Sequence, residues 1–150
     1  MSVKIASLRT LVTALAILYL PGDRGELVAH EFEVQFKRPT KDEREQFNAW
    51  MAAGKRPAPV DGSRDAEKDA DGKVPFLVTH LLDETVAGWG GMLDEQGQPV
   101  PYTHAERRAT DQVYDGLESA MGVAWYSTFW INQREAKEKN FVTPSRTGSA

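Results

Sequence analysis

The amino-acid sequence predicts an α+β fold: an N-terminal antiparallel β-hairpin or small sheet packed by a helix, followed by a mostly helical C-terminal half. Two kinds of local signal predict it. Residues 28–37 alternate between apolar and polar side chains, which is the period of a half-buried strand. Thr40 and Thr103 each stand three residues before a glutamate, which is the capping-box spacing at a helix N-terminus.

The hairpin occupies the first 37 residues. Its second arm directs four apolar side chains and one histidine to one face, namely Val28, His30, Phe32, Val34 and Phe36. Its first arm, residues 12–20, is apolar on both faces, so we expect it inside a sheet or under helices. Turn-forming residues connect the arms: Pro21, Gly22, Asp23, Arg24 and Gly25.

A helix follows Thr40 and ends before Gly54, with its apolar face at Phe47, Trp50 and Met51. The next segment, Lys55–Lys73, has ten charged residues among 19 and only four apolar ones. Such a segment buries too little to offset its ordering entropy, so we expect a mobile linker or long loop that trypsin cuts before any other internal segment. The chain then divides into residues 1–54, 55–73 and 74–150 within one compact domain.

The C-terminal part is predicted to be mostly helical. A short helix is expected over Pro75–Glu84, with the proline in its first turn. An apolar piece interrupted by glycines, a turn over residues 94–97 and an extended segment over residues 99–102 follow. From Thr103 a helical stretch runs to about Asn140, with a break expected near Gly122, and the tail beyond Phe141 is expected to be frayed.

Composition limits the function classes. The net charge of −4 argues against a general nucleic-acid-binding protein, and the lack of cysteine excludes disulfides and cysteine-bound metals. The apolar run at residues 11–20 is too short to cross a membrane, so no membrane partner is expected. It does resemble the apolar region of a signal peptide, although no small-x-small cleavage site follows it. An exported binding domain is therefore one alternative.

Motifs of catalysis and cofactor binding are missing from the sequence. The three histidines (His30, His80 and His104) lack metal-ligand spacing, so we expect structural roles for them. His30 lies on the apolar face of its strand, where we expect a core histidine with satisfied hydrogen bonds. Glu67, Asp69, Asp71 and Gly72 resemble the start of a calcium loop, but its twelfth position is Val78 instead of glutamate. We expect no enzyme activity, no cofactor and no bound metal.

Helical spacing suggests a surface for a protein partner. Met121, Trp125 and Phe129 share one face, which Tyr114 and Leu117 continue if the helix is unbroken at Gly122. On roughly the opposite face lie Val123, Tyr126 and Trp130. A helix that is apolar on both sides is either fully buried or presents one side to a partner. We predict that the first face packs on the core and that the second binds a partner or mediates self-association.

Three segments together resemble the small tail assembly chaperones of long-tailed bacteriophages. The first is the strand-to-helix junction FKRPTKDE at residues 36–43. The second and most specific is VAGWGGMLDEQGQPVPYT at residues 86–103, which is similar to the family's "G-W-x-G-v-x-D-E-x-G-x-P-V-P" segment. The third is the Lys139-Asn140 pair that closes the helical region. The long charged insert at residues 55–73 departs from the family pattern.

The resemblance implies a non-catalytic protein that binds the long, apolar, helical tape-measure protein and assists the tail-tube protein to polymerise around it. It also implies a location in the host cell cytoplasm and absence from the mature virion. The alternative from another class is a structural virion protein, such as a tail-completion or head–tail connector subunit.

Overall fold

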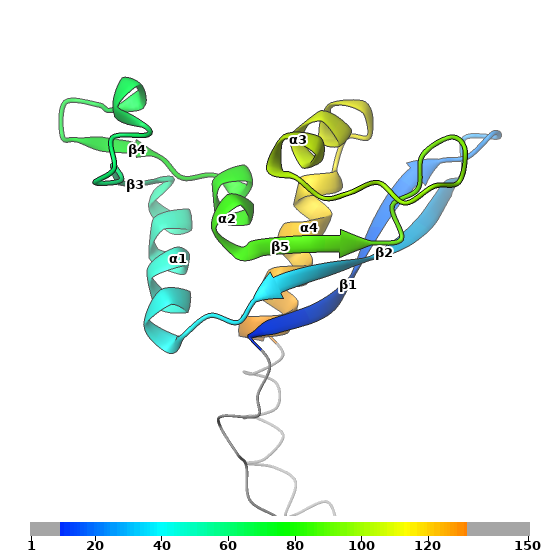
Figure 1. The fold of residues 1–150 in the computed structure, drawn as a ribbon, viewed down its shortest axis with the longest axis horizontal. Coiled ribbons are helices and arrows are strands. Elements are labelled where there is room, and N and C mark those ends of the chain that lie inside the picture. Colours follow the sequence, from blue (N-terminus) through cyan, green and yellow to red (C-terminus); the bar gives the residue numbers. More distant parts are fainter. Residues whose placement is uncertain (1–9, 132–150) are drawn as a thin grey trace, which may run out of the picture.

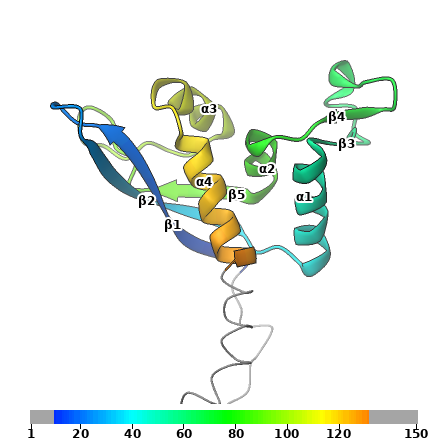
Figure 2. The same cartoon turned by 180° about the vertical axis from the view of Figure 1, so that it is seen from behind.

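The computed structural model describes residues 10–131, and its fold is of the predicted α+β type (Figure 1). A three-stranded antiparallel sheet has the order β1-β2-β5, formed by Leu11–Pro21, Leu27–Lys37 and Val86–Gly90. The helices are α1 (Lys41–Ala53), α2 (Val78–Thr85), α3 (His104–Val113) and α4 (Leu117–Tyr126). A π-helical turn, Ser127–Ile131, continues α4. Figure 2 shows α4 lying across one face of the sheet.

β1 and β2 form the predicted hairpin, with Val12 opposite Phe36 and Leu20 opposite Val28. On the face of β2 that was predicted to be apolar, the buried residues are Phe32, Val34 and Phe36. Val28 and His30 are exposed, because the turn end of the hairpin extends beyond the helices (Figure 1). The alternation therefore predicted the correct face, and the helices cover only its C-terminal half.

The first arm of the hairpin is not enclosed, contrary to expectation. β2 is the central strand and β1 is an edge strand, so one long side of β1 lacks a neighbouring strand among the described residues. The even-numbered side chains of β1 face α4 and include the buried Ala16 and Leu18. The odd-numbered apolar side chains are exposed on the opposite face of the sheet: Leu11, Leu15, Ile17 and Tyr19.

The predicted capping box at the start of α1 is confirmed. The Glu43 backbone N–H donates to Thr40 Oγ1 (3.1 Å), and the Thr40 N–H donates to Glu43 Oε1 (2.9 Å). Gly54 ends the helix at φ +74°, a left-handed conformation that glycine adopts without steric cost. Phe47 of α1 stacks on Phe76 with ring centroids 6.3 Å apart, which joins α1 to the core.

The segment after α1 contains regular structure that its composition did not predict. Lys55–Pro57 (β3) and Lys73–Pro75 (β4) pair as an antiparallel ribbon, and a 3-10 turn, Asp65–Glu67, lies between them. Pro75 therefore ends a strand, and α2 begins at Val78 instead of at the proline. Buried Val74 and Phe76 anchor this strand to the core, which overrides the local preference of proline for a helix start. The sensitivity of Lys55–Lys73 to trypsin stays a prediction.

The predicted turn after β5 is present. Asp94 Oδ1 accepts hydrogen bonds from the backbone N–H groups of Gln96 and Gln98, both at 2.9 Å. Leu93 and Pro99 form an isolated antiparallel bridge, so the chain reverses directly after the sheet.

The C-terminal helices break at a different place from the one expected. α3 begins after Thr103, whose Oγ1 accepts the Glu106 N–H (2.9 Å), and the chain turns at Gly116 with φ +98°. Gly122 lies inside α4, where a Cβ atom would stand 2.7 Å from Val78 Cγ2. The glycine thus allows α4 to pack closely on α2 instead of breaking the helix. The predicted continuation from residue 132 to Asn140 and the tail lie outside the described residues.

Candidate functional site

Helix α4 has the two contrasting faces that its sequence predicted. Met121, Trp125 and Phe129 are buried and pack against the sheet and α1; for example, the Trp125 and Phe47 rings lie 6.1 Å apart. Leu117 continues this buried face, whereas Tyr114 is exposed at the end of α3. The side of α4 that faces away from the core is therefore the first candidate for binding a partner.

Two of the three predicted partner-binding residues lie together. Val123 is 66 % exposed, and it lines a mainly apolar surface hollow of about 280 Å³ with Val78, Ser119, Gly122 and Tyr126. Tyr126 is half-buried against Trp125 with ring centroids 5.1 Å apart, and burial raises the pKa of its phenol. We call this the α2–α4 hollow.

Trp130 lies apart from this hollow. The Arg44 guanidinium of α1 stands 5.4 Å from the centre of its ring, in cation–π range. The chain changes from α-helical to π-helical geometry at Ser127, and the wider turn no longer follows the 3.6-residue spacing that grouped Trp130 with Val123 and Tyr126.

A second apolar depression lies between α4 and the edge strand β1, and it adjoins the α2–α4 hollow at Ser119 and Val123. Two adjoining cavities of about 480 and 380 Å³ are lined by residues of both elements. Both cavities touch the open edge of β1 at Ile17 and Tyr19, and both reach Ala120 and Val123 of α4. We call this depression the β1–α4 groove. The sequence pattern does not indicate this groove, because a strand that is apolar on both faces predicts a place inside a sheet or under helices.

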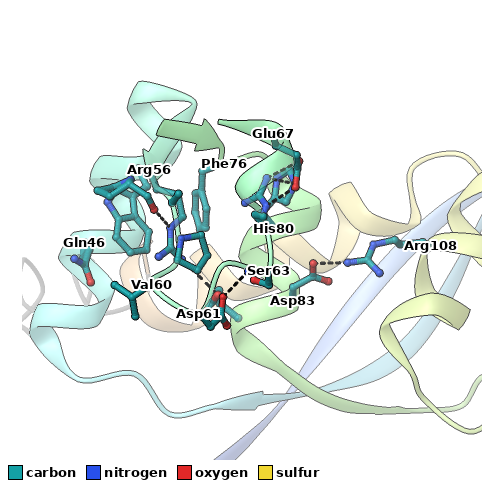
Figure 3. Close-up of a pocket in the computed structure, with 16 residues that line it drawn as sticks. Gln46, Arg56, Val60, Asp61, Ser63, Glu67, Phe76, His80, Asp83 and Arg108 are labelled. Atoms are coloured by element: carbon teal, nitrogen blue, oxygen red, sulfur yellow. Dashed lines mark hydrogen bonds and ion pairs between the residues drawn. The ribbon is translucent and has the colours of Figure 1, made fainter. Parts of the chain in front are cut away.

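A polar cleft of about 880 Å³ lies between α1, the ribbon segment and α2 (Figure 3). Its charged groups are largely paired with one another. Arg56 stacks on Trp50 at 4.3 Å and stands 3.5 Å from Glu84, while Arg64 donates to Glu67 at 2.8 Å. Arg56 thus connects the ribbon to α1 and α2, whereas the Arg64–Glu67 pair lies within the loop between the ribbon strands.

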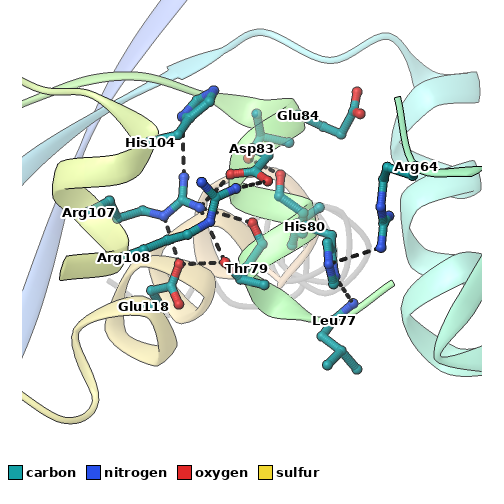
Figure 4. Close-up of polar contacts among 12 residues, drawn as sticks. Arg64, Leu77, Thr79, His80, Asp83, Glu84, His104, Arg107, Arg108 and Glu118 are labelled. Atoms are coloured by element: carbon teal, nitrogen blue, oxygen red, sulfur yellow. Dashed lines mark hydrogen bonds and ion pairs between the residues drawn. The ribbon is translucent and has the colours of Figure 1, made fainter. Parts of the chain in front are cut away.

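A buried arginine joins the three helices α2, α3 and α4 (Figure 4). Arg107 of α3 is fully buried; its Nε donates to Glu118 (2.7 Å) and its Nη2 to Asp83 (2.5 Å). Nη1 donates to the Tyr102 hydroxyl (2.8 Å). Burial opposes the charge, but the hydrogen bonds to Asp83 and Glu118 raise the pKa of the Arg107 guanidinium. No local sequence pattern indicates this group, because the partners of Arg107 come from separate elements.

Two histidines have structural hydrogen bonds, as expected. His80 Nδ1 accepts the Leu77 N–H (2.9 Å) at the start of α2, and burial followed by the nearby Arg64 charge lowers the pKa of His80. His104 Nδ1 lies 2.8 Å from the Tyr102 hydroxyl, and burial lowers the pKa of His104. The expectation that His30 lies in the core is wrong: it is exposed on β2, where the turn end of the hairpin extends beyond the helices (Figure 1).

The acidic loop is used for local structure. Asp69 Oδ1 accepts the N–H groups of Asp71 and Lys73 (2.9 Å each), and Glu67 pairs with Arg64. Within residues 10–131, no three His, Asp or Glu side chains gather into a group that could hold a metal ion. Every helix in this range is too short or too polar to span a bilayer.

Comparisons with protein-family models, with curated proteins and with solved structures gave no significant match.

Proposed function

We propose that this protein is a tail assembly chaperone of a long-tailed bacteriophage, which binds the tape-measure protein and assists assembly of the tail tube without catalysis. In this proposal it acts in the cytoplasm of the host cell and is absent from the finished virion. The observation that carries the proposal is the segment of residues 86–103, whose order of glycines, tryptophan, acidic turn and prolines resembles that family.

The geometry of this segment supports the proposal, because its distinctive residues depend on one another. Trp89 Nε1 donates to the Val100 carbonyl (2.8 Å), and the Trp89 and Tyr102 rings meet edge to face at 5.0 Å. The Asp94 turn brings the two halves of the segment together. The matching residues therefore build one folded unit, so their spacing reflects a structural requirement.

The α2–α4 hollow supports a helical partner. Amphipathic helices bind apolar grooves through anchors that repeat every three to four residues. Val78, Val123 and Tyr126 offer apolar and aromatic contact area at the surface, with the rigid core behind them. Aromatic anchors of this type commonly contribute about 2 kcal/mol or more to binding. We propose that an apolar helix of the tape-measure protein binds at this hollow.

Co-expression with the tape-measure protein of the same genome tests the function. The wild-type chain should keep the tape-measure protein in the soluble fraction and purify with it. Tyr126→Ala should weaken this complex by more than about tenfold with little change in melting temperature, because Tyr126 is half-buried at the surface. Tyr114→Ala, at an exposed tyrosine away from the hollow, is the matched control and should bind normally.

Two results would count against the proposal. A tape-measure protein that stays insoluble and unbound with the wild-type chain would remove the chaperone function. Many copies of the chain in purified virions, measured by mass spectrometry, would favour the alternative of a tail-completion or head–tail connector subunit.

A further inference from the structure

The outer side of β1 carries unpaired backbone groups. The Arg38 N–H donates to the Thr10 carbonyl (2.7 Å) and the Gly22 N–H to the Glu26 carbonyl (2.6 Å). These two bonds lie at the two ends of the hairpin, and both involve even-numbered residues. The even-numbered residues of β1 therefore exchange backbone hydrogen bonds with β2. The odd-numbered residues 11–19 direct their N–H and C=O groups away from β2. Within residues 10–131, none of these groups has a backbone partner on that side.

This edge lacks the features that usually prevent strand pairing. Natural edge strands are shortened, bulged or charged, whereas β1 has eleven residues in continuous register and none of them is charged. Its outer face is apolar at Leu15 (55 % exposed), Ile17 and Tyr19. Only Pro21, at the end of the strand, would interrupt a ladder.

The β1–α4 groove lies along the same edge. A strand added to β1 would place alternate side chains in this groove, beside Ala120 and Val123. The small side chains of Ala120, Ser119 and Ser127 leave space there for a neighbouring backbone or helix. Figure 2 shows β1 and α4 on the same side of the molecule, so one partner can cover both.

We propose that the partner is a second copy of this chain, which pairs its β1 antiparallel to the first across a two-fold axis. Such an axis places each uncharged strand against an identical uncharged strand, and it brings both copies of α4 to the same face of a six-stranded sheet. Stacking the two sheets face to face is disfavoured instead, because Glu31 and Glu33 of β2 would oppose like charges.

Charge complementarity at the strand ends supports this arrangement. In a full antiparallel overlap, the hairpin turn, where Asp23 and Glu26 outnumber Arg24, approaches the opposite end of the other copy, which carries the partner's Lys37 and the partner's Arg38. Asp23 stands at least two strand spacings from the partner's Lys37, about 10 Å, which is close to the Debye length at 0.1 M salt, whereas Glu26 on the β2 side of the turn is about three spacings away. The contact occurs twice in the dimer because of the two-fold symmetry.

The size of the surface is sufficient for a specific dimer. An eleven-residue strand is about 36 Å long, and a strand with its flanking helix is about 15 Å wide. The patch then offers roughly 500 Å² on each copy, so the dimer buries on the order of 1,000 Å². This area lies at the lower limit of specific interfaces, which predicts a reversible dimer rather than a permanent one.

Sedimentation equilibrium over a range of concentrations tests the proposal. The wild-type chain should reach twice its mass of 16.7 kDa. Ile17→Pro removes one outward-facing N–H without breaking a bond to β2, and it should abolish the dimer. Leu15→Lys should raise the dimer dissociation constant more than about tenfold, because in a full overlap the two new lysines lie at diagonally adjacent positions of the paired strands, next to the two-fold axis. Leu93→Lys changes a leucine of similar exposure (61 %) away from β1 and should leave the dimer intact.

Circular dichroism separates loss of the dimer from loss of the fold. The proposal stands if Leu15→Lys retains the wild-type spectrum and is monomeric while Leu93→Lys dimerises. A wild-type chain that stays monomeric at high micromolar concentration overturns it and leaves a strand of another protein as the occupant of the groove. A dimer that survives both Ile17→Pro and Leu15→Lys overturns it as well, because its interface must lie elsewhere. Neither result depends on the tape-measure protein, so this test is independent of the proposed function.

Discussion

Replacement of Arg107 by methionine should cost a large part of a small domain's stability. Methionine keeps the apolar stem of the side chain and removes the guanidinium, so Glu118 loses its buried cation (Figure 4). The Glu118 side chain is only 12 % exposed and retains a hydrogen bond from the Thr79 hydroxyl (2.9 Å). Asp83 is less affected because Arg108 also binds it. Removing one partner of a buried ion pair costs about 3–5 kcal/mol, against roughly 5–15 kcal/mol for a whole domain.

Urea unfolding followed by circular dichroism measures this cost. Arg108→Ala is the matched control. Arg108 also forms an ion pair with Asp83, but its side chain is 48 % exposed to solvent, so we expect a loss of no more than about 1 kcal/mol. Adding Glu118→Gln to Arg107→Met should recover about 1–3 kcal/mol, because it removes the stranded charge. If Arg107→Met costs as little as Arg108→Ala, the arginine does not hold α2, α3 and α4 together as argued.

Three further changes test separate parts of the fold. Gly122→Ala should lower the unfolding free energy by about 1 kcal/mol in urea titrations, because the new Cβ would overlap Val78. Alanine has the higher helix propensity, so a gain in stability would contradict this overlap. Phe36→Ala should cost about 3–5 kcal/mol in the same assay, and a loss below 1 kcal/mol would exclude its place in the core. The pKa of His80 is lower in the folded state, so the unfolded chain binds more protons and stability should fall as pH drops below about 6.5. His80→Gln should flatten that pH dependence, and an unchanged profile would exclude the partly buried His80 imidazole beside the Arg64 charge as its origin.

Local signals in the sequence predicted the elements whose cause is local. The alternation over Phe32, Val34 and Phe36 identified the buried face of β2, and the Thr40–Glu43 spacing identified the start of α1. Both signals depend on neighbours within a few residues, so no knowledge of the rest of the fold is needed. The two faces of α4 were also predictable, since helical spacing alone separates Val123 from Trp125.

The arrangement of elements that are distant in sequence could not be predicted in this way. Pro75 is compatible with a helix start, and only the pairing of β4 with β3 and the burial of Phe76 place it in a strand. Trp130 left its predicted face because the chain turns π-helical beside α1. The partners of Arg107 lie up to 28 residues away, and no spacing rule relates them.

The sequence by itself determined the α+β class, the hairpin, the helix caps and the absence of cysteine chemistry, because each follows from residue type and short-range periodicity. The tertiary structure alone decided that β1 lies at an edge, since a strand apolar on both faces has the same local pattern whether or not another strand pairs with it. Sheet order depends on which long-range pairings form. Because β5 pairs with β2, β1 is left at the edge of the sheet next to α4. This edge and the groove beside it form the surface where a second copy is proposed to bind.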